Sequence, residues 1–406
     1  MIHIAVLGYG TIGTGVVEVL NTNGESISKR AGDHITIKYV LDLREFPGDP
    51  IMEKLVHDVN IILEDPDIKI VVEVMGGVEP AYTFVKKALL RGKSVVTSNK
   101  ELVAKHGAEL IDLAKESSVN FLFEASVGGG IPIIRPLNQS LTADEIVEIT
   151  GILNGTTNYI LTKMSEEGVG FDTALAAAQK MGYAERNPAA DVEGHDACRK
   201  IAILSSLAFG MQVDFEDIYT EGITKITDID IKYAKAMGAR IKLFASSIRG
   251  SDSKVYAMVA PVLIKASHPL YSVNDVFNGI FVRGNVIGDV MFYGSGAGKL
   301  PTASAVVADV VDAAKHIGKN IWTIWSSKKL ELTNINKVQH RFFLRVKENN
   351  PAIKEQIRAL FGAVEEVTAP EVTGEYAFLT SSISEEDLKE KEKALEGLLS
   401  VIRVRF

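Results

Sequence analysis

Residues 2–20, which read I-H-I-A-V-L-G-Y-G-T-I-G-T-G-V-V-E-V-L, decide the fold of the first part of the chain. Apolar residues 2–7 predict a buried strand, the glycine turn follows at once, and apolar residues at helical spacing begin at Val16. In such a unit the first glycine allows a tight turn, the second lets backbone approach a pyrophosphate, and the third lets helix and strand pack closely. We therefore expect a dinucleotide to bind at Gly8, Gly10, Thr11, Ile12 and Gly13.

The next hundred residues repeat the alternation of strand and helix. Strands are predicted at residues 35–41, 68–75, 94–97 and 120–125. This order predicts an α/β fold with a Rossmann-like parallel sheet, whose ligands bind beyond the carboxyl ends of the strands.

Polar residues stand at two of these strand ends. Asp42 suits the adenosine ribose hydroxyls of NAD, whereas Arg44 suits the 2′-phosphate of NADP, so the choice of cofactor stays open. Ser98 and Lys100 stand where a nicotinamide and a substrate would meet. Position alone equally allows Lys100 to be a surface lysine that closes a strand.

The composition is that of a globular protein with two or three domains, at 406 residues, 46% hydrophobic and 24% charged. A net charge of −8 argues against nucleic acid or an anionic membrane as the main partner and favours a small molecule. The single cysteine, Cys198, fits a reducing compartment, and we see no signal peptide or apolar run that could cross a bilayer. We therefore expect a cytoplasmic protein.

A second polar stretch, G-Y-A-E-R-N-P-A-A-D-V-E-G-H-D-A-C-R-K, runs from Gly182 to Lys200. Asp196 and Lys200 are four residues apart, so a helix would place both on one face. Alone, this spacing favours a solvated ion pair. Around it we predict an α+β region that follows the glycines at 128–130, with strands at 145–153, 255–263 and 280–292, a polar turn at 154–158, and helices at 172–181, 201–209 and 302–317.

Six motifs between the N-terminal turn and residue 309 carry a family resemblance. They are S-N-K at 98–100, E-A-S-V-G-G-G-I-P-I at 124–133, G-I-L-N-G-T-T-N-Y-I-L at 151–161, G-Y-A-E at 182–185, A-D-V-E-G-H-D-A-C-R-K at 190–200 and G-A-G-K-L-P-T-A-S-A-V-V-A-D at 296–309. With the N-terminal turn, they resemble homoserine dehydrogenases. The resemblance implies reversible, NAD(P)-dependent conversion of L-aspartate 4-semialdehyde and L-homoserine, in the threonine, isoleucine and methionine branch of biosynthesis.

The resemblance also implies roles for single residues. Lys200 would donate and accept the proton, with Lys100 as the competing candidate, and Gly298 would lie at the cofactor. Those implied to line the substrate are Gly182, Glu185, Asp191, Asp196 and Lys200. A sodium site is implied at Glu124 and the carbonyl groups of Val127, Gly129 and Ile131, although these glycines also suit a structural hinge.

A few positions depart from the family pattern. Asn187 replaces a common aspartate, and His195 stands at a usually apolar position, where a packed or exposed histidine is expected rather than a catalytic one. Lys299 follows the last glycine turn, where a cation could assist a phosphate.

Residues 338–406 predict the order β-α-β-β-α-β, with strands at 339–346, 364–372, 375–383 and 401–406 and helices at 353–361 and 385–399. This ferredoxin-like order resembles an ACT domain, which implies an amino-acid effector such as L-threonine. The turn Asn349-Asn350-Pro351-Ala352 lacks the usual glycine, so a purely structural dimer module is the alternative.

The expected domains are consecutive. A dinucleotide-binding domain would span 1–128, with 298–320 packing back on it, and a substrate-binding, catalytic and dimerisation domain would span 129–297. A linker at 321–337 would lead to the ACT-like domain at 338–406, in a homodimer or homotetramer. Two other functions compete with the enzyme: a non-catalytic protein that senses nucleotides and amino acids, and a dehydrogenase of another amino-acid aldehyde.

Overall fold

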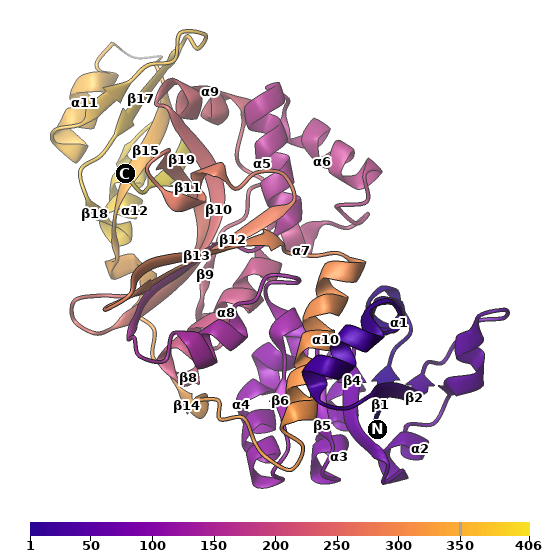
Figure 1. Cartoon of the computed structure of the whole chain (residues 1–406). Helices are drawn as coiled ribbons and strands as arrows, with labels where there is room; N and C mark the ends of the chain where they lie inside the picture. The colour runs from indigo at the N-terminus through magenta and orange to yellow at the C-terminus, as the bar shows by residue number, and fades with distance from the viewer. Residues whose placement is uncertain (349–350) are drawn as a thin grey trace. The chain divides into compact units, whose positions relative to one another are not determined.

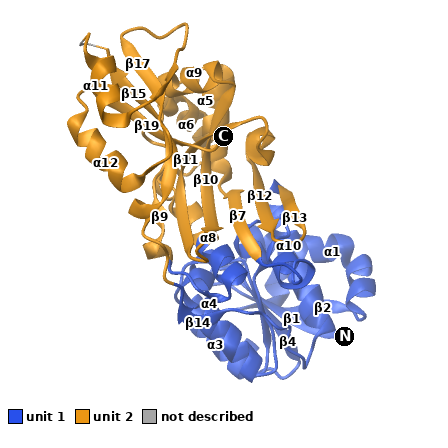
Figure 2. Cartoon of the chain, turned by 90° about the vertical axis from the view of Figure 1, so that its left-hand side faces the viewer, with its two compact units in different colours: residues 1–145, 202–214, 294–330 blue, residues 146–201, 215–293, 331–406 orange. Residues whose placement is uncertain are grey.

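The computed structural model describes residues 1–348 and 351–406, and the chain forms two compact units (Figure 2). Unit 1 contains residues 1–145, 202–214 and 294–330, and unit 2 contains residues 146–201, 215–293 and 331–406. Each unit gathers segments from distant parts of the chain. The division into consecutive domains therefore stays a prediction.

Unit 1 is built on a parallel sheet, which confirms the predicted Rossmann-like architecture (Figure 1). Its strands lie in the order β3-β2-β1-β4-β5-β6, and helices connect most of the consecutive parallel strands. Their bounds are β1 Ile2–Leu7, β2 Ile35–Leu41, β3 Leu55–Val56, β4 Ile68–Glu73, β5 Ser94–Thr97 and β6 Phe121–Leu122.

The strand expected at 120–125 is shorter than predicted. Only Phe121–Leu122 pair with β5, and Glu124–Ser126 form a 3-10 turn. The backbone N–H of Glu124 donates to Asp309, and its carboxylate accepts N–H groups from residues 133–135, so side-chain bonds replace the ladder there.

Helices of unit 1 cover this sheet, and one of them comes from far along the chain. They are α1 Thr11–Ala31, α2 Val59–Glu64, α3 Ala81–Leu90, α4 Lys100–Glu116 and α10 Lys299–Lys315. α10 packs on α1 so closely that a Cβ on Gly15 would lie 2.9 Å from the carbonyl oxygen of Lys299. Its buried face includes Val306 and Val310, so α10 is part of the core around β1.

Unit 2 is built on an eleven-stranded mixed sheet, whose main path is β13-β12-β7-β10-β11-β19-β15-β17-β16. Its first half contains β7 Ile146–Ile152, β10 Ala239–Arg249, β11 Val255–Lys265, β12 Phe277–Gly284 and β13 Gly288–Ser295, with β9 Tyr219–Thr220 paired to β11. The helices of this half are α5 Gly155–Glu167, α6 Phe171–Lys180, α7 Ala189–Val192, α9 Asp228–Ala236 and the start of α8 His195–Phe209, whose residues from 202 onwards belong to unit 1. β10 was not anticipated from the sequence.

The polar turn predicted at 154–158 was wrong. Those residues begin α5, because the Asn154 side chain caps the helix by accepting the N–H of Thr157 at 2.9 Å. The helix then ends at Gly168, which has a φ of +67°.

The last part of unit 2 has the predicted order of strands and helices, with one short extra strand. Its elements are β15 Gln339–Lys347, α11 Ile353–Phe361, β16 Glu365–Val367, β17 Glu375–Leu379, β18 Ile383–Ser384, α12 Glu385–Ala394 and β19 Leu398–Val404. β19 pairs in parallel with β11, so these strands continue the sheet of the preceding part. The strand expected at 364–372 shrinks to three residues, and Asn349 and Asn350 lie outside the described residues.

The segment expected as a linker carries buried structure. Trp325 is 3% exposed, and its indole N–H donates to Gln212 at 2.9 Å. Next to it, β14 Ser326–Lys329 pairs with β8 Met211–Gln212. Within the part of the chain that the structure describes, no helix is long and apolar enough to cross a membrane.

Candidate active site

The N-terminal glycines of unit 1 have the geometry that dinucleotide binding requires. Gly8 has a φ of +100°, which side chains avoid, and a Cβ on Gly13 would lie 2.0 Å from the Gly8 carbonyl oxygen. Gly10 caps α1 without a side-chain hydrogen bond, and a Cβ there would meet no atom within 4 Å. The turn therefore offers open backbone and the N-terminus of α1 to an anionic group.

A cavity of about 510 Å³ lies beside this turn. It is lined by glycines of the turn, by residues that follow β2, β3 and β4, and by the first residues of α2 and α3. They are Gly8, Gly10, Leu41, Asp42, Leu43, Arg44, His57, Val59, Val74, Met75, Gly76, Pro80 and Phe84. Volume, apolar walls and few polar groups suit the adenosine part of a dinucleotide.

Asp42 and Arg44 form a bidentate salt bridge at this cavity. The Arg44 guanidinium donates to both Asp42 oxygens, at 3.0 and 2.9 Å, and the Tyr9 N–H donates to the same carboxylate at 2.8 Å. These bonds, Arg44 foremost, hold the pKa of Asp42 well below its usual range. Both polar groups thus lie where the sequence placed them, and a ribose or a 2′-phosphate would meet them together.

Lys100 follows the carboxyl end of β5 and is the first residue of α4. The preceding Asn99 caps α4 by accepting the Leu102 N–H at 3.1 Å, and the Ser98 N–H donates to Glu73 at 3.4 Å. Lys100 begins α4, where the helix dipole disfavours a positive charge. Helix stability therefore does not explain a lysine at this position.

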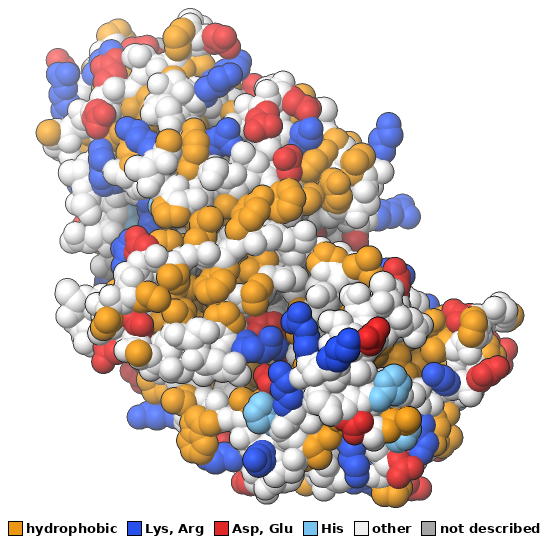
Figure 3. Space-filling model, viewed as in Figure 1, with side chains coloured by type: hydrophobic (Ala, Val, Ile, Leu, Met, Phe, Trp, Pro, Cys, Tyr) orange, Lys and Arg blue, Asp and Glu red, His pale blue; other side chains and the backbone are white. Residues whose placement is uncertain are grey.

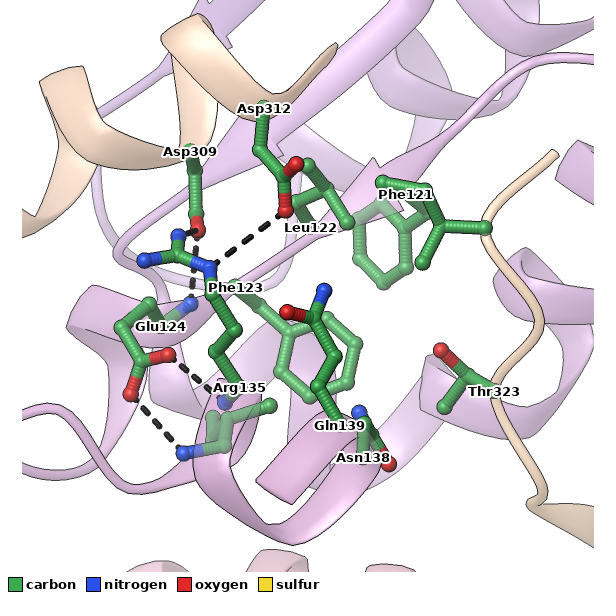
Figure 4. Close-up of a pocket in the computed structure, with 12 residues that line it drawn as sticks. Phe121, Leu122, Phe123, Glu124, Arg135, Asn138, Gln139, Asp309, Asp312 and Thr323 are labelled. Carbon is green, nitrogen blue, oxygen red and sulfur yellow. Dashed lines mark hydrogen bonds and ion pairs between the residues drawn. The ribbon is translucent and has the colours of Figure 1, made fainter. Parts of the chain in front are cut away.

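Glu124 lies in a cluster of buried charges in unit 1 (Figure 4). Its carboxylate accepts the N–H groups of Ile133, Ile134 and Arg135 at 2.6, 2.8 and 2.7 Å. Arg135 in turn pairs with Asp309 and, at 3.4 Å, with Asp312. Three of the four acceptor positions of this carboxylate are therefore used by backbone N–H groups, and its expected role in a sodium site stays a prediction.

The glycines at 128–130 contact another glycine loop of the same unit. A Cβ on Gly129, whose φ is +58°, would lie 2.3 Å from the Gly296 carbonyl oxygen, and the Gly130 N–H donates to Ser295 at 3.0 Å. This close approach explains the glycines without an ion. Among the described residues, no group of three or more His, Cys, Asp or Glu side chains is arranged to hold a metal.

The turn before α10 carries Gly298, with a φ of +122°. Lys299, which could have faced a phosphate, pairs with Glu18 of α1 at 2.6 Å. Both side chains of this pair are partly exposed. Nothing in this contact supports the expectation that Lys299 assists a phosphate group.

Unit 2 brings together the acids and the lysine of the second polar stretch. The Lys200 ammonium lies 2.7 Å from Asp196 and 2.8 Å from the Leu153 carbonyl oxygen, and the two side chains are only 10% and 7% exposed. Asn154 donates to Asp191 at 2.7 Å and to Asp196 at 3.0 Å. The pair is therefore buried, unlike the solvated pair that its spacing alone suggested.

The chain reaches this geometry through a turn at Gly194, whose φ is +85°. The turn separates α7, which carries Asp191, from α8, which begins one residue before Asp196. Burial raises the pKa of Asp191, and the nearby Asp196 charge raises it further, whereas the Asn154 hydrogen bond lowers it.

Other residues of the stretch lie outside this cluster. Gly182 has a φ of +76° and lies, with Glu185, on the exposed part of the loop after α6. His195 is half-exposed beside Glu193, and Asn187 accepts the Ala189 N–H, so both are surface positions. Cys198 is buried, with its thiol donating to the Phe215 carbonyl oxygen at 3.3 Å.

Asn154 is the functional candidate that was not singled out from the sequence. An asparagine before a helical run is a recognisable cap signal, which would have placed it at a helix start. Its two carboxylate partners, 37 and 42 residues away, carry no such local signal.

Comparisons with known proteins point to one family. Residues 8–124 match the family model "Homoserine dehydrogenase, NAD binding domain", and residues 132–311 match "Homoserine dehydrogenase". The homoserine dehydrogenase of Synechocystis is 49% identical over 319 residues, covering 77% of this chain and 73% of that protein. That of Bacillus subtilis is 44% identical over 319 residues, covering 78% and 73%. The chain belongs to the homoserine dehydrogenase family.

Solved structures of homoserine dehydrogenases support the same assignment. The enzyme from Thiobacillus denitrificans has a TM-score of 0.90 at 35% identity and covers 100% of this chain and 98% of its own. The S. aureus enzyme at pH 7.5 has a TM-score of 0.83 at 35% identity, with 100% and 98% covered. A hyperthermophilic archaeal homoserine dehydrogenase, solved with NADPH, has a TM-score of 0.66 at 29% identity and covers 77% and 97%.

Family membership makes the chain an NAD(P)-dependent oxidoreductase that acts on small molecules. The glycine turn and its cavity lie inside the region matched by the NAD binding model. The acids and Lys200 lie inside the region matched by the second model.

Proposed function

We propose that the chain interconverts L-aspartate 4-semialdehyde and L-homoserine in threonine, isoleucine and methionine biosynthesis in the cytoplasm. The buried Asp196–Lys200 pair is the observation that carries this proposal for the site. Desolvating two charges is costly, so a pair held at 2.7 Å with an added carbonyl contact suits chemistry better than stability.

Lys200 is the proposed proton donor for reduction and the acceptor for oxidation. An ammonium has three N–H donors, and the contacts with Asp196 and Leu153 leave one for the substrate oxygen. Bound NAD(P) supplies the hydride for the aldehyde carbon. Asp196 pairs with the Lys200 ammonium and orients it.

The remaining roles concern binding. Gly182, Glu185, Asp191 and Asp196 are proposed to line the substrate, because carboxylates suit its ammonium and hydroxyl groups. Lys100 is proposed to share polarisation of the substrate oxygen. Gly8, Gly10, Thr11, Ile12, Gly13, Asp42, Arg44, Ser98 and Gly298 are the proposed cofactor positions.

The test is homoserine-dependent reduction of NAD and NADP by the purified protein. Lys200→Ala should lower kcat on the order of 10²- to 10⁴-fold, the usual contribution of a positioned acid or base. Lys100→Ala is measured in parallel, and the matched control is Lys163→Ala, a partly exposed lysine of unit 2 whose ion pair is with Glu167 on the same helix. A wild-type protein that is inactive with both cofactors would overturn the proposal.

L-Threonine is proposed to inhibit the enzyme through residues 338–406. The predicted β-α-β-β-α-β order, which many effector-binding modules share, supports this regulation. Initial rates at millimolar L-threonine test it, and an unchanged rate would leave this part as a structural module.

A homodimer or homotetramer is also proposed. Apolar side chains gather over the strands around β12 and β13 on the face shown in Figure 3. Exposed ones in this hairpin include Val286, Ile287, Met291 and Tyr293, and β13 is the edge strand of the sheet. Light scattering after size exclusion measures the mass, and a monomer at micromolar concentration would contradict the proposal.

A sodium ion at Glu124 and the carbonyl groups of Val127, Gly129 and Ile131 is also proposed. Activity in sodium and potassium at equal ionic strength tests it, and equal rates in a cation-free buffer would remove the ion from the mechanism.

A further inference from the structure

Asn154 lies at a junction that serves both the fold and the site. It follows Leu153 at the end of β7 and caps α5, where its Oδ1 accepts the Thr157 N–H at 2.9 Å and the Thr157 hydroxyl at 3.0 Å. The residue is 6% exposed. Replacing an asparagine cap by serine costs little stability, because the serine hydroxyl also accepts a hydrogen bond from the helix N–H group.

The amide nitrogen of the same side chain faces two acids. It donates to Asp191 Oδ1 at 2.7 Å and to Asp196 Oδ2 at 3.0 Å, which uses both of its N–H groups. Its orientation is fixed, because the opposite orientation would place the amide oxygen against two carboxylates and the amide N–H groups against the Thr157 N–H. One oriented side chain therefore caps α5 through its oxygen and holds the two acids, as a clamp, through its nitrogen.

The two acids come from different elements and share one neighbourhood with Lys200. Asp191 lies on α7, whereas Asp196 and Lys200 lie on α8. Asp196 Oδ2 accepts from both Asn154 and Lys200, and Lys200 also donates to the carbonyl of Leu153. The Leu153 carbonyl group thus holds the lysine, and the Asn154 side chain holds the two acids.

We infer that Asn154 is a positioning residue, whose amide holds Asp191 and Asp196 beside Lys200. The reason is electrostatic as well as geometric. Two buried carboxylates repel each other, and a shared neutral donor stabilises both charges without neutralising Lys200. This role rests on the proposed function for its catalytic consequence but not for its structural one.

Two variants separate the clamp from the cap. Asn154→Ser keeps an oxygen for the Thr157 N–H but has no amide donor to reach the acids. Asn154→Asp keeps the shape and the cap and replaces the donor by a third carboxylate. Ser384→Ala is the matched control, because it removes the cap of α12, where Ser384 accepts the Asp387 N–H.

The kinetic readout is the acid limb of the kcat/KM pH profile for homoserine oxidation. The titratable groups that the cluster brings together are Asp191 on α7 and Asp196 and Lys200 on α8; the contacting residues of α5, Thr156 and Thr157, do not titrate. Losing a donor to an ionised acid raises its pKa, and adding a negative charge raises it more. The limb should move to higher pH in Asn154→Ser and further in Asn154→Asp, with kcat at pH 8 lowered by about 10- to 100-fold, a usual effect of misplaced groups.

The structural readout does not need activity. Hydrogen exchange by mass spectrometry should show faster exchange in peptides covering 187–198 in both Asn154 variants and no change there in Ser384→Ala. Unchanged exchange, or a pH profile equal to that of the wild type in both Asn154 variants, would overturn the inference. If the wild type itself is inactive, the proposed function fails, and hydrogen exchange alone decides the role of Asn154.

Discussion

At the scale of single residues, Lys242 is a buried titratable side chain that the catalytic proposal does not use. It is 2% exposed, and its ammonium donates to Asn158, Val273 and Asn274, all neutral acceptors. Burial, together with the smaller effect of the Arg240 charge, lowers the pKa of Lys242 to about 7. Asn158 belongs to α5, so this lysine ties the helix that Asn154 begins to the loop before β12.

Lys242 should make stability depend on pH with a definite sign. Its folded pKa of about 7 lies below the unfolded value of roughly 10.4. Between these values the unfolded chain binds more protons, so raising the pH stabilises the fold, by at most about 1.4 kcal/mol per pH unit. The advantage of Lys242 is lost as pH falls towards 7.

The measurement is urea denaturation from pH 7 to 10 at one protein concentration, for the wild type and Lys242→Met. The difference in unfolding free energy, wild type minus variant, should rise with pH across this window. Lys163→Met, at a partly exposed lysine, should give a flat difference. A flat difference for Lys242→Met as well would show that its three acceptors keep the pKa near normal.

At the scale of elements, the loops that join strands and helices decide the geometry of both units. α8 begins only because Gly194 reverses the chain, and α10 packs on α1 only because Gly15 has no side chain. The glycine loop at 128–130 follows the same principle. It meets the loop at 294–298 by backbone alone, so a side chain has no place to go.

Gly129→Ala should therefore destabilise unit 1. Its Cβ would lie 2.3 Å from the Gly296 carbonyl oxygen at a φ of +58°, so overpacking and backbone strain add, at roughly 1–3 kcal/mol each. Gly168→Ala is the control, because it has a similar φ of +67° and open space for the Cβ. Thermal unfolding should show a clearly larger loss for Gly129→Ala, and equal losses would mean that the contact with Gly296 yields easily.

At the scale of the whole molecule, contacts within unit 2 connect its C-terminal strand β19 with the loop that carries the proposed catalytic residues. Arg403 on β19 pairs with Glu385 at 2.6 Å and with Glu221 at 2.7 Å. Two residues after Glu221, the Ile223 N–H donates to the Val192 carbonyl oxygen at 2.8 Å, at the end of α7. A physical path therefore connects the proposed effector module with the helix that carries Asp191.

Arg403→Met should cost about 3–5 kcal/mol of unfolding free energy, because it leaves two acids without their buried partner. Arg341→Met on β15 is the control, since its pair with Glu365 is 35% and 68% exposed and such pairs contribute about 0–1 kcal/mol. Chemical denaturation of both variants measures the costs. Similar small losses of unfolding free energy in both variants would show that water or protonation compensates Glu385 and Glu221 for the loss of Arg403.

The sequence by itself determined the parallel sheet of unit 1, the dinucleotide turn and the order of elements at the C-terminus. These follow from strand and helix periodicity and from glycines at fixed spacing, which are local properties of the chain. It also placed Asp196 and Lys200 on one helical face, because four residues make about one turn. Ends of elements were less certain, as β6 and β16 show, since pairing partners rather than propensity fixed them.

Only the tertiary structure decided what these residues touch. It buried the Asp196–Lys200 pair, gave Asn154 both acids to hold, turned the Glu124 carboxylate to backbone N–H groups, and set Gly129 against Gly296. Each contact joins positions that are separated along the chain or depends on burial by other elements. Local sequence patterns carry no record of such partners, because their energies arise only when the chain has folded.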